Sequence, residues 1–323
     1  MAGEGIALDD LSFLGQGLKR PECVLCTSDG SVFAADWDGG VSRIGPDGVQ
    51  RRCLAETEPW VRPNGVALSR DGSFLLAHLG DEDGGVYRLR RDGSLQPVIT
   101  EVEGESLPPT NYVLEDAQGR LWITVSTRLK PRILGCRPDV ADGFIVLLDD
   151  EGARIVADGL GYTNEIQFDD QGRHLYVNET FGRRLSRFRV AADGSLSGKE
   201  TVAEFGPGTF PDGLAFDAEG AVWITSIVSN RVIRVQPDGR QELVLEDSDA
   251  AHLAWVEAAY LAGALQRQHL DNIVSRRLHN ISSLAFGGPD LKTVYLGCLL
   301  GDSLASFRAP VAGRAPLHWE IRA

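Results

Sequence analysis

The chain has 323 residues, with 32 lysines and arginines against 46 aspartates and glutamates, which gives a formal net charge of −14. Because this charge repels phosphate groups, we expect neither nucleic acid nor an anionic membrane surface as a partner. No apolar run approaches the roughly 18 residues of a membrane span, and the first residues lack the basic start and long apolar stretch of a signal peptide.

One motif recurs six times along the chain. In each copy, a polar residue is followed eight positions later by the glycine or aspartate of a turn, with the same apolar spacing between them. The copies begin, in chain order, at Glu22 (ECVLCTSDG), Asn64 (NGVALSRDG), Asn111 (NYVLEDAQG), Asn164 (NEIQFDDQG), Asp212 (DGLAFDAEG) and Ser282 (SSLAFGGPD). An apolar, strand-like run follows every turn, from SVFAADW after the first to LKTVYLGCL after the sixth. A repeat this regular indicates one structural unit used six times.

The six leading polar residues are 42, 47, 53, 48 and 70 positions apart. A period of about 40–50 residues is typical of a four-stranded propeller blade. Second turns such as GPDG and QPDG, and alternating strands such as VYRLRR, agree with that unit. We therefore predict an all-β fold, a six-bladed β-propeller formed by residues 1–323 as a single domain. The residues before Glu22 are predicted to add a strand to the last blade, beside SLASFRA, and so to close the ring.

The widest spacing contains one helix-sized insertion in the region of the last blade, at about residues 248–279. Ser248 or Asp249 is a suitable N-cap, and apolar residues recur near the helical period after it. The insertion is predicted to pack on the rim of the propeller. A lid over the channel and a dimer contact are the alternatives, and we expect either a monomer or a homodimer.

Cysteine usage favours a reducing environment. Five cysteines is an odd number for a long chain, which indicates a cytoplasmic location. Cys23 and Cys26 form a C-x-x-C pair, but on a strand they face opposite sides, and no second pair completes a zinc site. We predict that both are buried thiols.

Equivalent residues of a closed ring of blades converge on its axis. Besides Asn64, four of the leading residues carry carboxylate or amide oxygens, and these four form the predicted site: Glu22, Asn111, Asn164 and Asp212. Such a set suits one hard divalent cation. Ca²⁺ is favoured because it tolerates mixed oxygen ligands, with Zn²⁺, Mn²⁺ or Mg²⁺ as alternatives. Asn-Gly and Asp-Gly also occur simply as turns, and this alternative is strongest for Asn64, which precedes Gly65.

With this repeat and this set of oxygens, the chain resembles the SMP-30/gluconolactonase family of six-bladed propellers, which includes regucalcin. The resemblance covers most of the chain and is carried by Glu22 and by TNYVLEDAQGRLWIT, TNEIQFDDQGRHLYVNET, FPDGLAFDAEGAVWIT and FGGPDLKTVYLG. It implies a divalent metal held by Glu22, Asn164 and Asp212. It also implies that Asn111 contacts the substrate or completes the metal shell.

The chain departs from the family pattern at three places. Glu22 is followed by Cys23-Val24 instead of Gly-Pro, Pro109 stands where an arginine is common, and Tyr112 stands where an aspartate commonly follows the substrate asparagine. These changes remove polar groups that would contact sugar hydroxyls. We therefore expect a small-molecule substrate that is a more apolar lactone or another ester-like compound.

The resemblance implies a metal-dependent lactonase, a hydrolase that opens an intramolecular ester. The metal is expected to act as a Lewis acid, and Asp212 to orient or deprotonate the attacking water. The expected substrate-binding residues are Asn111, Asn64, Tyr112 and Ser282.

Two other functions remain open. The same oxygen set serves phosphotriesterases of the diisopropylfluorophosphatase type, which the family resemblance also reaches. A propeller that binds calcium or another ligand without turnover is the alternative outside the hydrolases, because a fold does not determine function.

Overall fold

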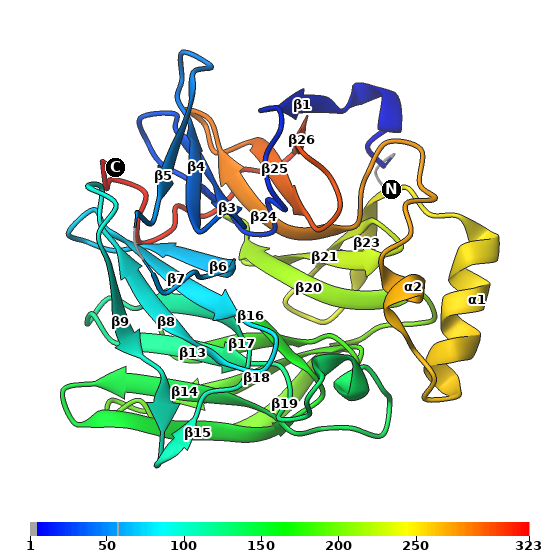
Figure 1. The fold of residues 1–323 in the computed structure, drawn as a ribbon. Helices are drawn as coiled ribbons and strands as arrows, with labels where there is room; N and C mark the ends of the chain where they lie inside the picture. Colours follow the sequence, from blue (N-terminus) through cyan, green and yellow to red (C-terminus); the bar gives the residue numbers. More distant parts are fainter. Residues whose placement is uncertain (1–4, 57, 323) are drawn as a thin grey trace.

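The computed structural model describes residues 5–56 and 58–322. Six antiparallel sheets of four strands each surround a central axis (Figure 1). The innermost strand of each sheet contacts the innermost strands of its two neighbours, in the closed order β2, β6, β12, β16, β20, β24. The predicted all-β, six-bladed propeller is confirmed.

The first three blades run outward from the axis in chain order. Blade one contains β2 (Val24–Cys26), β3 (Val32–Asp36), β4 (Gly40–Ile44) and β5 (Gln50–Leu54). Blade two contains β6 (Pro63–Leu68), β7 (Phe74–Leu79), β8 (Gly84–Leu89) and β9 (Leu95–Ile99), and the small hairpin β10 (Glu101–Val102) and β11 (Glu105–Ser106) follows it. Blade three contains β12 (Thr110–Glu115), β13 (Leu121–Val125), β14 (Gly143–Asp149) and β15 (Gly152–Leu160), with the 3₁₀ turn η2 (Arg132–Gly135) between β13 and β14.

The other three blades follow the same plan. Blade four contains β16 (Thr163–Phe168), β17 (His174–Glu179), β18 (Arg184–Val190) and β19 (Leu196–Glu204). Blade five contains β20 (Thr209–Phe216), β21 (Val222–Val228), β22 (Arg231–Val235) and β23 (Gln241–Glu246). Blade six contains β24 (Ile281–Gly287), β25 (Thr293–Cys298), β26 (Leu304–Arg308) and β1 (Ser12–Leu14), and the 3₁₀ turn η1 (Leu8–Asp10) precedes β1.

The strand from the N-terminus closes the ring. β1 pairs antiparallel with β26, with Ser12 opposite Ser306 and Leu14 opposite Leu304. The last blade therefore combines both ends of the chain, as predicted, and its outer edge is formed by the three residues of β1. A closure of this kind ties the first blade to the last and limits the exposed sheet edge.

The turn sequences explain the tight inner hairpins. Gly30 and Gly72 adopt φ values of 82° and 80°, a backbone conformation that a side chain disfavours. In each of these turns an aspartate side chain accepts a hydrogen bond from the backbone two residues later: Ser31 N donates to Asp29 Oδ1 at 3.0 Å, and Ser73 N to Asp71 at 2.9 Å.

Large aromatic side chains fill the space between blades. Trp122 and Trp223 are fully buried at equivalent positions of two repeats. Each indole N–H finds an acceptor in the aspartate of the preceding turn, at 2.8 Å to Asp116 and 2.9 Å to Asp217. The Trp122 ring also meets Phe168 of the next blade edge to face. Satisfying the indole N–H removes the polar cost of burying these rings.

The insertion between β23 and β24 contains α1 (Ala250–Leu261) and the short α2 (Arg267–Leu270), which lie side by side at one edge of the propeller (Figure 1). Asp249 is the N-cap and accepts a hydrogen bond from His252 N at 2.8 Å, one of the two caps predicted. Tyr260 packs against Phe210 and donates a hydrogen bond to the carbonyl of Phe181 at 2.6 Å. In the described part of the chain, no helix is long and apolar enough to cross a membrane.

Candidate functional site

Bulges in the inner strands interrupt their regular alternation at the leading residues. In five of the six blades, the pairing of the innermost strand with the second strand skips at this position. The residues within these interruptions are Asn64, Asn111, Asn164, Asp212 and Ser282. A bulge bends the strand and redirects a side chain, and this explains how the leading position is turned inward in these five blades.

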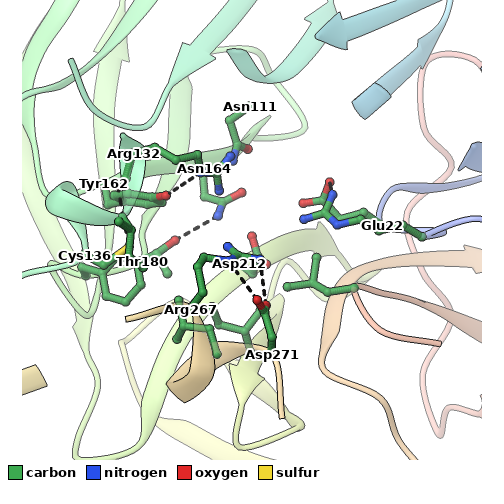
Figure 2. A pocket seen from close by; sticks show the side chains of 16 residues that line it. Glu22, Asn111, Arg132, Cys136, Tyr162, Asn164, Thr180, Asp212, Arg267 and Asp271 are labelled. Atoms are coloured by element: carbon green, nitrogen blue, oxygen red, sulfur yellow. Dashed lines mark hydrogen bonds and ion pairs between the residues drawn. The ribbon is translucent and has the colours of Figure 1, made fainter. Parts of the chain in front are cut away.

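Four of the leading residues line one cavity of about 40 Å³ near the axis: Glu22, Asn111, Asn164 and Asp212. All four are buried. Figure 2 shows Glu22 on one side of this space, opposite the other three. The structure therefore brings together the four residues predicted to hold the metal.

Asn64 and Ser282 lie behind Glu22 and do not line the cavity. The Asn64 amide donates to Glu22 Oε1 at 2.7 Å and to the backbone carbonyl of Asn111 at 3.1 Å. The Ser282 hydroxyl donates to the backbone carbonyl of Glu22 at 2.9 Å. Both residues thus hold Glu22 in place from neighbouring blades.

Tyr112 lies elsewhere. Its side chain lines a larger cavity of about 630 Å³, whose walls are the parts of the inner strands that follow the leading residues. Segments near the C-terminus, including Leu317 and His318, cover part of this second cavity. Of the residues proposed for substrate binding, only Asn111 reaches the smaller cavity.

Three buried oxygens at the small cavity have no hydrogen-bond donor within the described chain: Glu22 Oε2, Asn111 Oδ1 and Asn164 Oδ1. The Asn164 amide nitrogen donates to Thr180 Oγ1 at 3.0 Å, and this bond turns its oxygen away from Thr180. Buried polar atoms are rarely left unpaired. Three orphaned oxygens from three blades, beside the Asp212 carboxyl, match the ligand set of a hard cation.

The amides are essential to any such site. No group of three or more His, Cys, Asp or Glu side chains gathers within residues 5–56 and 58–322. Two carboxylates alone make a weak site, so a cation in this cavity needs the oxygens of Asn111 and Asn164.

Burial makes both carboxyls costly to ionise. Desolvation raises the pKa of Glu22, although Arg20 and Arg132 oppose that shift. Desolvation also raises the pKa of Asp212 well above its usual value, and the charges of Glu22 and Glu165 raise it further. A cation bound between the two carboxyls would favour their charged forms.

Three arginines that the repeat analysis did not identify also line the cavity: Arg20, Arg132 and Arg267. Arg20 donates to Asn64 Oδ1 at 2.9 Å, approaches Glu22 Oε2 at 3.5 Å and covers the Trp37 ring. Because Arg20 lies two residues before Glu22, its place near the cavity could have been inferred from the sequence. Arg132 lies in the β13–β14 connection and Arg267 in the insertion, where no repeat position marked them.

The rest of the wall is mainly apolar, with part of it supplied by the insertion. Ile227, Leu270 and Leu299 line the cavity, and Arg267 pairs there with Asp271 (Figure 2). The insertion therefore packs on the rim, as predicted, and also walls the site.

Cys136 is the thiol of this cavity. Burial raises its pKa to about 12, so the group is a neutral thiol near pH 7. Because the thiolate is the nucleophilic form, Cys136 is unsuited to attack a substrate. Like Cys136, the Cys23 and Cys26 thiols are free and buried, as predicted for the latter two.

Comparisons with known proteins agree with the fold. Residues 55–247 match the family model described as the SMP-30/Gluconolactonase/LRE-like region. A 6-deoxy-6-sulfogluconolactonase of Pseudomonas putida is 27% identical over 233 residues, which cover 71% of this chain and 66% of that protein, just under two thirds of its length. A pentonolactonase of Haloferax volcanii is 27% identical over 271 residues, covering 82% and 75% of the two chains.

A solved structure extends the likeness to nearly the whole chain. The calcium-binding protein regucalcin from Agrobacterium tumefaciens superposes with a TM-score of 0.66 at 17% identity, covering 96% of this chain and 98% of that one. At this identity the likeness concerns the fold. The family match, in contrast, spans more than half of the chain, and the protein belongs to the SMP-30/gluconolactonase/LRE-like family.

Proposed function

We propose that this protein is a metal-dependent lactonase, which hydrolyses the intramolecular ester of a sugar lactone. The observation that carries the proposal is the cluster of three buried oxygens that accept no hydrogen bond in the described chain, beside the Asp212 carboxyl in one small cavity. Two relatives that match most of this chain are named as lactonases, which supports this reaction over others available to a propeller.

Ca²⁺ is the cation that we favour. Its proposed ligands are Glu22, Asn111, Asn164 and Asp212, which supply oxygen alone, and calcium accepts mixed and irregular oxygen sets. A structural neighbour is named as a calcium-binding protein, which is consistent with this choice. When bound, the cation supplies Lewis acidity that polarises the lactone carbonyl.

Asp212 is the proposed general base. Its carboxyl makes no side-chain hydrogen bond within residues 5–56 and 58–322, so it is free to accept a proton from water. Desolvation raises its pKa in the metal-free site, whereas a bound cation would favour the carboxylate, which is the form that accepts a proton. Water adds to the carbonyl carbon, the ring C–O bond breaks, and the proton taken by Asp212 passes to the departing alkoxide. The products are a hydroxyl and a carboxylic acid, which releases its proton to solvent near neutral pH and leaves a carboxylate.

Glu22 has a different proposed role. Its Oε1 is held by Asn64 at 2.7 Å, and Arg20 lies 3.5 Å from Oε2. A carboxylate fixed in this way is a better ligand than proton carrier. Asn111 is proposed to contact the substrate or to complete the metal shell, and Arg20 keeps Asn64 and Glu22 aligned.

The test is a panel of lactones followed by pH-stat titration, because ring opening releases acid. We expect turnover that is lost after treatment with a chelator and restored by Ca²⁺. An organophosphate panel run in parallel distinguishes a phosphotriesterase. Calcium binding without hydrolysis of any compound would favour a ligand-binding propeller and contradict the proposal.

A further inference from the structure

We infer that the substrate is an acidic sugar lactone, one that carries a carboxylate, sulfonate or phosphate group besides the ring ester, and that Arg132 binds this anion. The inference rests on the proposed lactonase function. It names the substrate class of the same site and assigns its specificity to a residue outside the propeller repeat.

Arg132 is held in place from one side only. Its Nε donates to the Tyr162 hydroxyl at 3.0 Å, and its guanidinium lies 5.7 Å from the centre of the Tyr162 ring. Tyr162 is itself buried and meets Phe181 edge to face at 4.8 Å. The guanidinium is therefore fixed in orientation before any ligand arrives, and preorganisation of this kind lowers the entropy lost on binding.

The free end of Arg132 is directed toward the cavity. Nη1 is buried and has no hydrogen-bond partner in the described chain. Figure 2 shows the side chain extending toward Asn111 and Asn164. An unpaired charged donor that is hidden from water is costly, so its position is best explained by a ligand that accepts its hydrogen bonds.

The other two arginines of the cavity have protein acceptors. Arg267 forms two hydrogen bonds with Asp271, at 2.9 and 2.7 Å. Arg20 is bonded to Asn64 and lies near Glu22. Among the described side chains of this cavity, Arg132 is thus the guanidinium without an acidic partner in contact.

The charge balance of the site also favours an anion. Arg267 and Asp271 neutralise each other, while the formal charges of Arg20 and Arg132 offset those of Glu22 and Asp212. A divalent cation adds two positive charges to this neutral set. An anionic group on the substrate compensates part of that excess in a buried site, where charges interact more strongly than in bulk water.

The expectation of a more apolar lactone was based on Pro109 and Tyr112 and did not include Arg132. Planar guanidinium groups match carboxylate, sulfonate and phosphate oxygens, and hydrogen bonds between charged partners are stronger than those to neutral hydroxyls.

The experiment compares kcat/KM for 6-phosphogluconolactone, glucarolactone and neutral gluconolactone. We expect the wild-type protein to prefer at least one acidic lactone by about 10- to 100-fold, the range that a charge-assisted hydrogen bond provides. Arg132→Gln should bring this ratio close to one, and Arg132→Lys should retain part of it. The two acidic substrates distinguish phosphate from carboxylate.

Arg187→Gln is the matched control. Arg187 donates to the Tyr176 hydroxyl at 2.9 Å and lies 5.8 Å from that ring, as Arg132 does with Tyr162, but it is on β18 and pairs with Glu200. This variant should keep the wild-type ratio. Circular dichroism and thermal unfolding confirm that each variant is folded.

A binding measurement provides a readout independent of turnover. Calorimetric titration of the metal-free protein compares 6-phosphogluconate and glucarate with neutral glucitol, and we expect at least one of the two anions to bind more tightly, a preference that Arg132→Gln removes. Turnover of neutral and acidic lactones at equal efficiency, with a ratio unchanged in Arg132→Gln, overturns the inference and leaves the lactonase proposal intact. Failure to hydrolyse any lactone overturns the proposed function, and the titration then decides the anion site: loss of preference in Arg132→Gln supports it, and no preference in the wild type overturns it.

Discussion

The Asn64 amide of β6 donates a 2.7 Å hydrogen bond to Glu22 Oε1 at the start of the neighbouring blade. This bond occupies one carboxylate oxygen, while the other oxygen, Oε2, lies buried at the cavity without a donor. Asn64 therefore orients the proposed metal ligand from outside the cavity, and groups that orient metal ligands in this way strongly influence affinity.

Asn64→Ala is expected to weaken Ca²⁺ binding by about 10- to 100-fold, the usual effect of losing a group that orients a ligand. Isothermal titration calorimetry measures it. Asn272→Ala is a suitable control, because Asn272 is exposed and its amide bonds only to Gln268 in the insertion. Unchanged calcium affinity in Asn64→Ala would show that Glu22 needs no such support.

Asp212→Asn is expected to abolish lactone hydrolysis and yet to stabilise the metal-free protein. Burial raises the Asp212 pKa, so the folded state holds the proton more tightly than the unfolded state. The contribution to stability is complete below the unfolded pKa and is lost as the pH rises through the folded pKa. The melting temperature of the variant should therefore exceed that of the wild type more at pH 8.5 than at pH 5, both in chelator.

Two results for Asp212→Asn would contradict this prediction. Hydrolysis by Asp212→Asn at the wild-type rate would exclude Asp212 as the base. A melting-temperature difference that shrinks with rising pH would contradict a raised Asp212 pKa.

Glu165→Gln tests the buried carboxyl that follows Asn164. Desolvation raises the Glu165 pKa to about 8. Glu165 therefore stabilises the wild-type protein fully below pH 4.5 and loses this contribution as the pH rises through 8. The glutamine variant should gain a few kcal/mol of stability relative to the wild type between pH 5 and pH 9, on the order expected from such a shift.

Urea unfolding at the two pH values measures the effect of Glu165→Gln. Glu151→Gln, at an exposed turn, serves as the control and should follow the wild type at both pH values. Parallel pH dependences for Glu165→Gln and the wild type would mean that Glu165 titrates normally.

Glu179→Ala is expected to lower the free energy of unfolding by about 2–4 kcal/mol, because it leaves the buried Gly161 N–H and Ser186 hydroxyl without their acceptor. The fully buried Glu179 carboxylate accepts hydrogen bonds from Arg184 at 2.7 Å and Ser186 at 2.6 Å, and Lys199 lies 2.8 Å away. These partners oppose desolvation and lower its pKa to about 2.

Because its pKa is lowered, the contribution of Glu179 to the free energy of unfolding depends on pH in the acid range. Its contribution is present above the unfolded pKa and is lost as the pH falls toward 2, so the gap between the variant and the wild type should narrow in acid. Urea unfolding at pH 7 and pH 3 checks both expectations, and a gap that widens at pH 3 would refute them.

The fold followed from local regularity in the sequence. Each blade is built from hairpins between residues close in the chain. Turns such as Asp29-Gly30 and the apolar runs beside them therefore predicted both the blade and the number of blades. The position shared by Glu22, Asn111, Asn164 and Asp212 then followed from symmetry, because equivalent residues of a closed ring approach one axis. The strand before Glu22 was predictable for a similar reason: an open ring leaves an edge to be covered.

The roles of individual side chains depended on contacts between distant segments. Asn64 occupies the same repeat position as the proposed ligands, yet its amide donates a hydrogen bond to Glu22. No sequence pattern distinguishes a metal ligand from a residue that orients one. Tyr112 follows Asn111 directly but lines the other cavity, and no sequence pattern assigns neighbouring residues of one strand to two cavities.

Arg132 is the clearest case of a residue that only the tertiary structure could place. It belongs to an irregular connection with no repeat position, and it meets the cavity through its bond to Tyr162, thirty residues further along the chain. The sequence by itself determined the blades, their number and the ring of oxygens, since these are set by short-range periodicity. Which charges face the substrate was decided by how loops of different blades fold over the axis, and that depends on packing between segments whose sequences carry no common pattern.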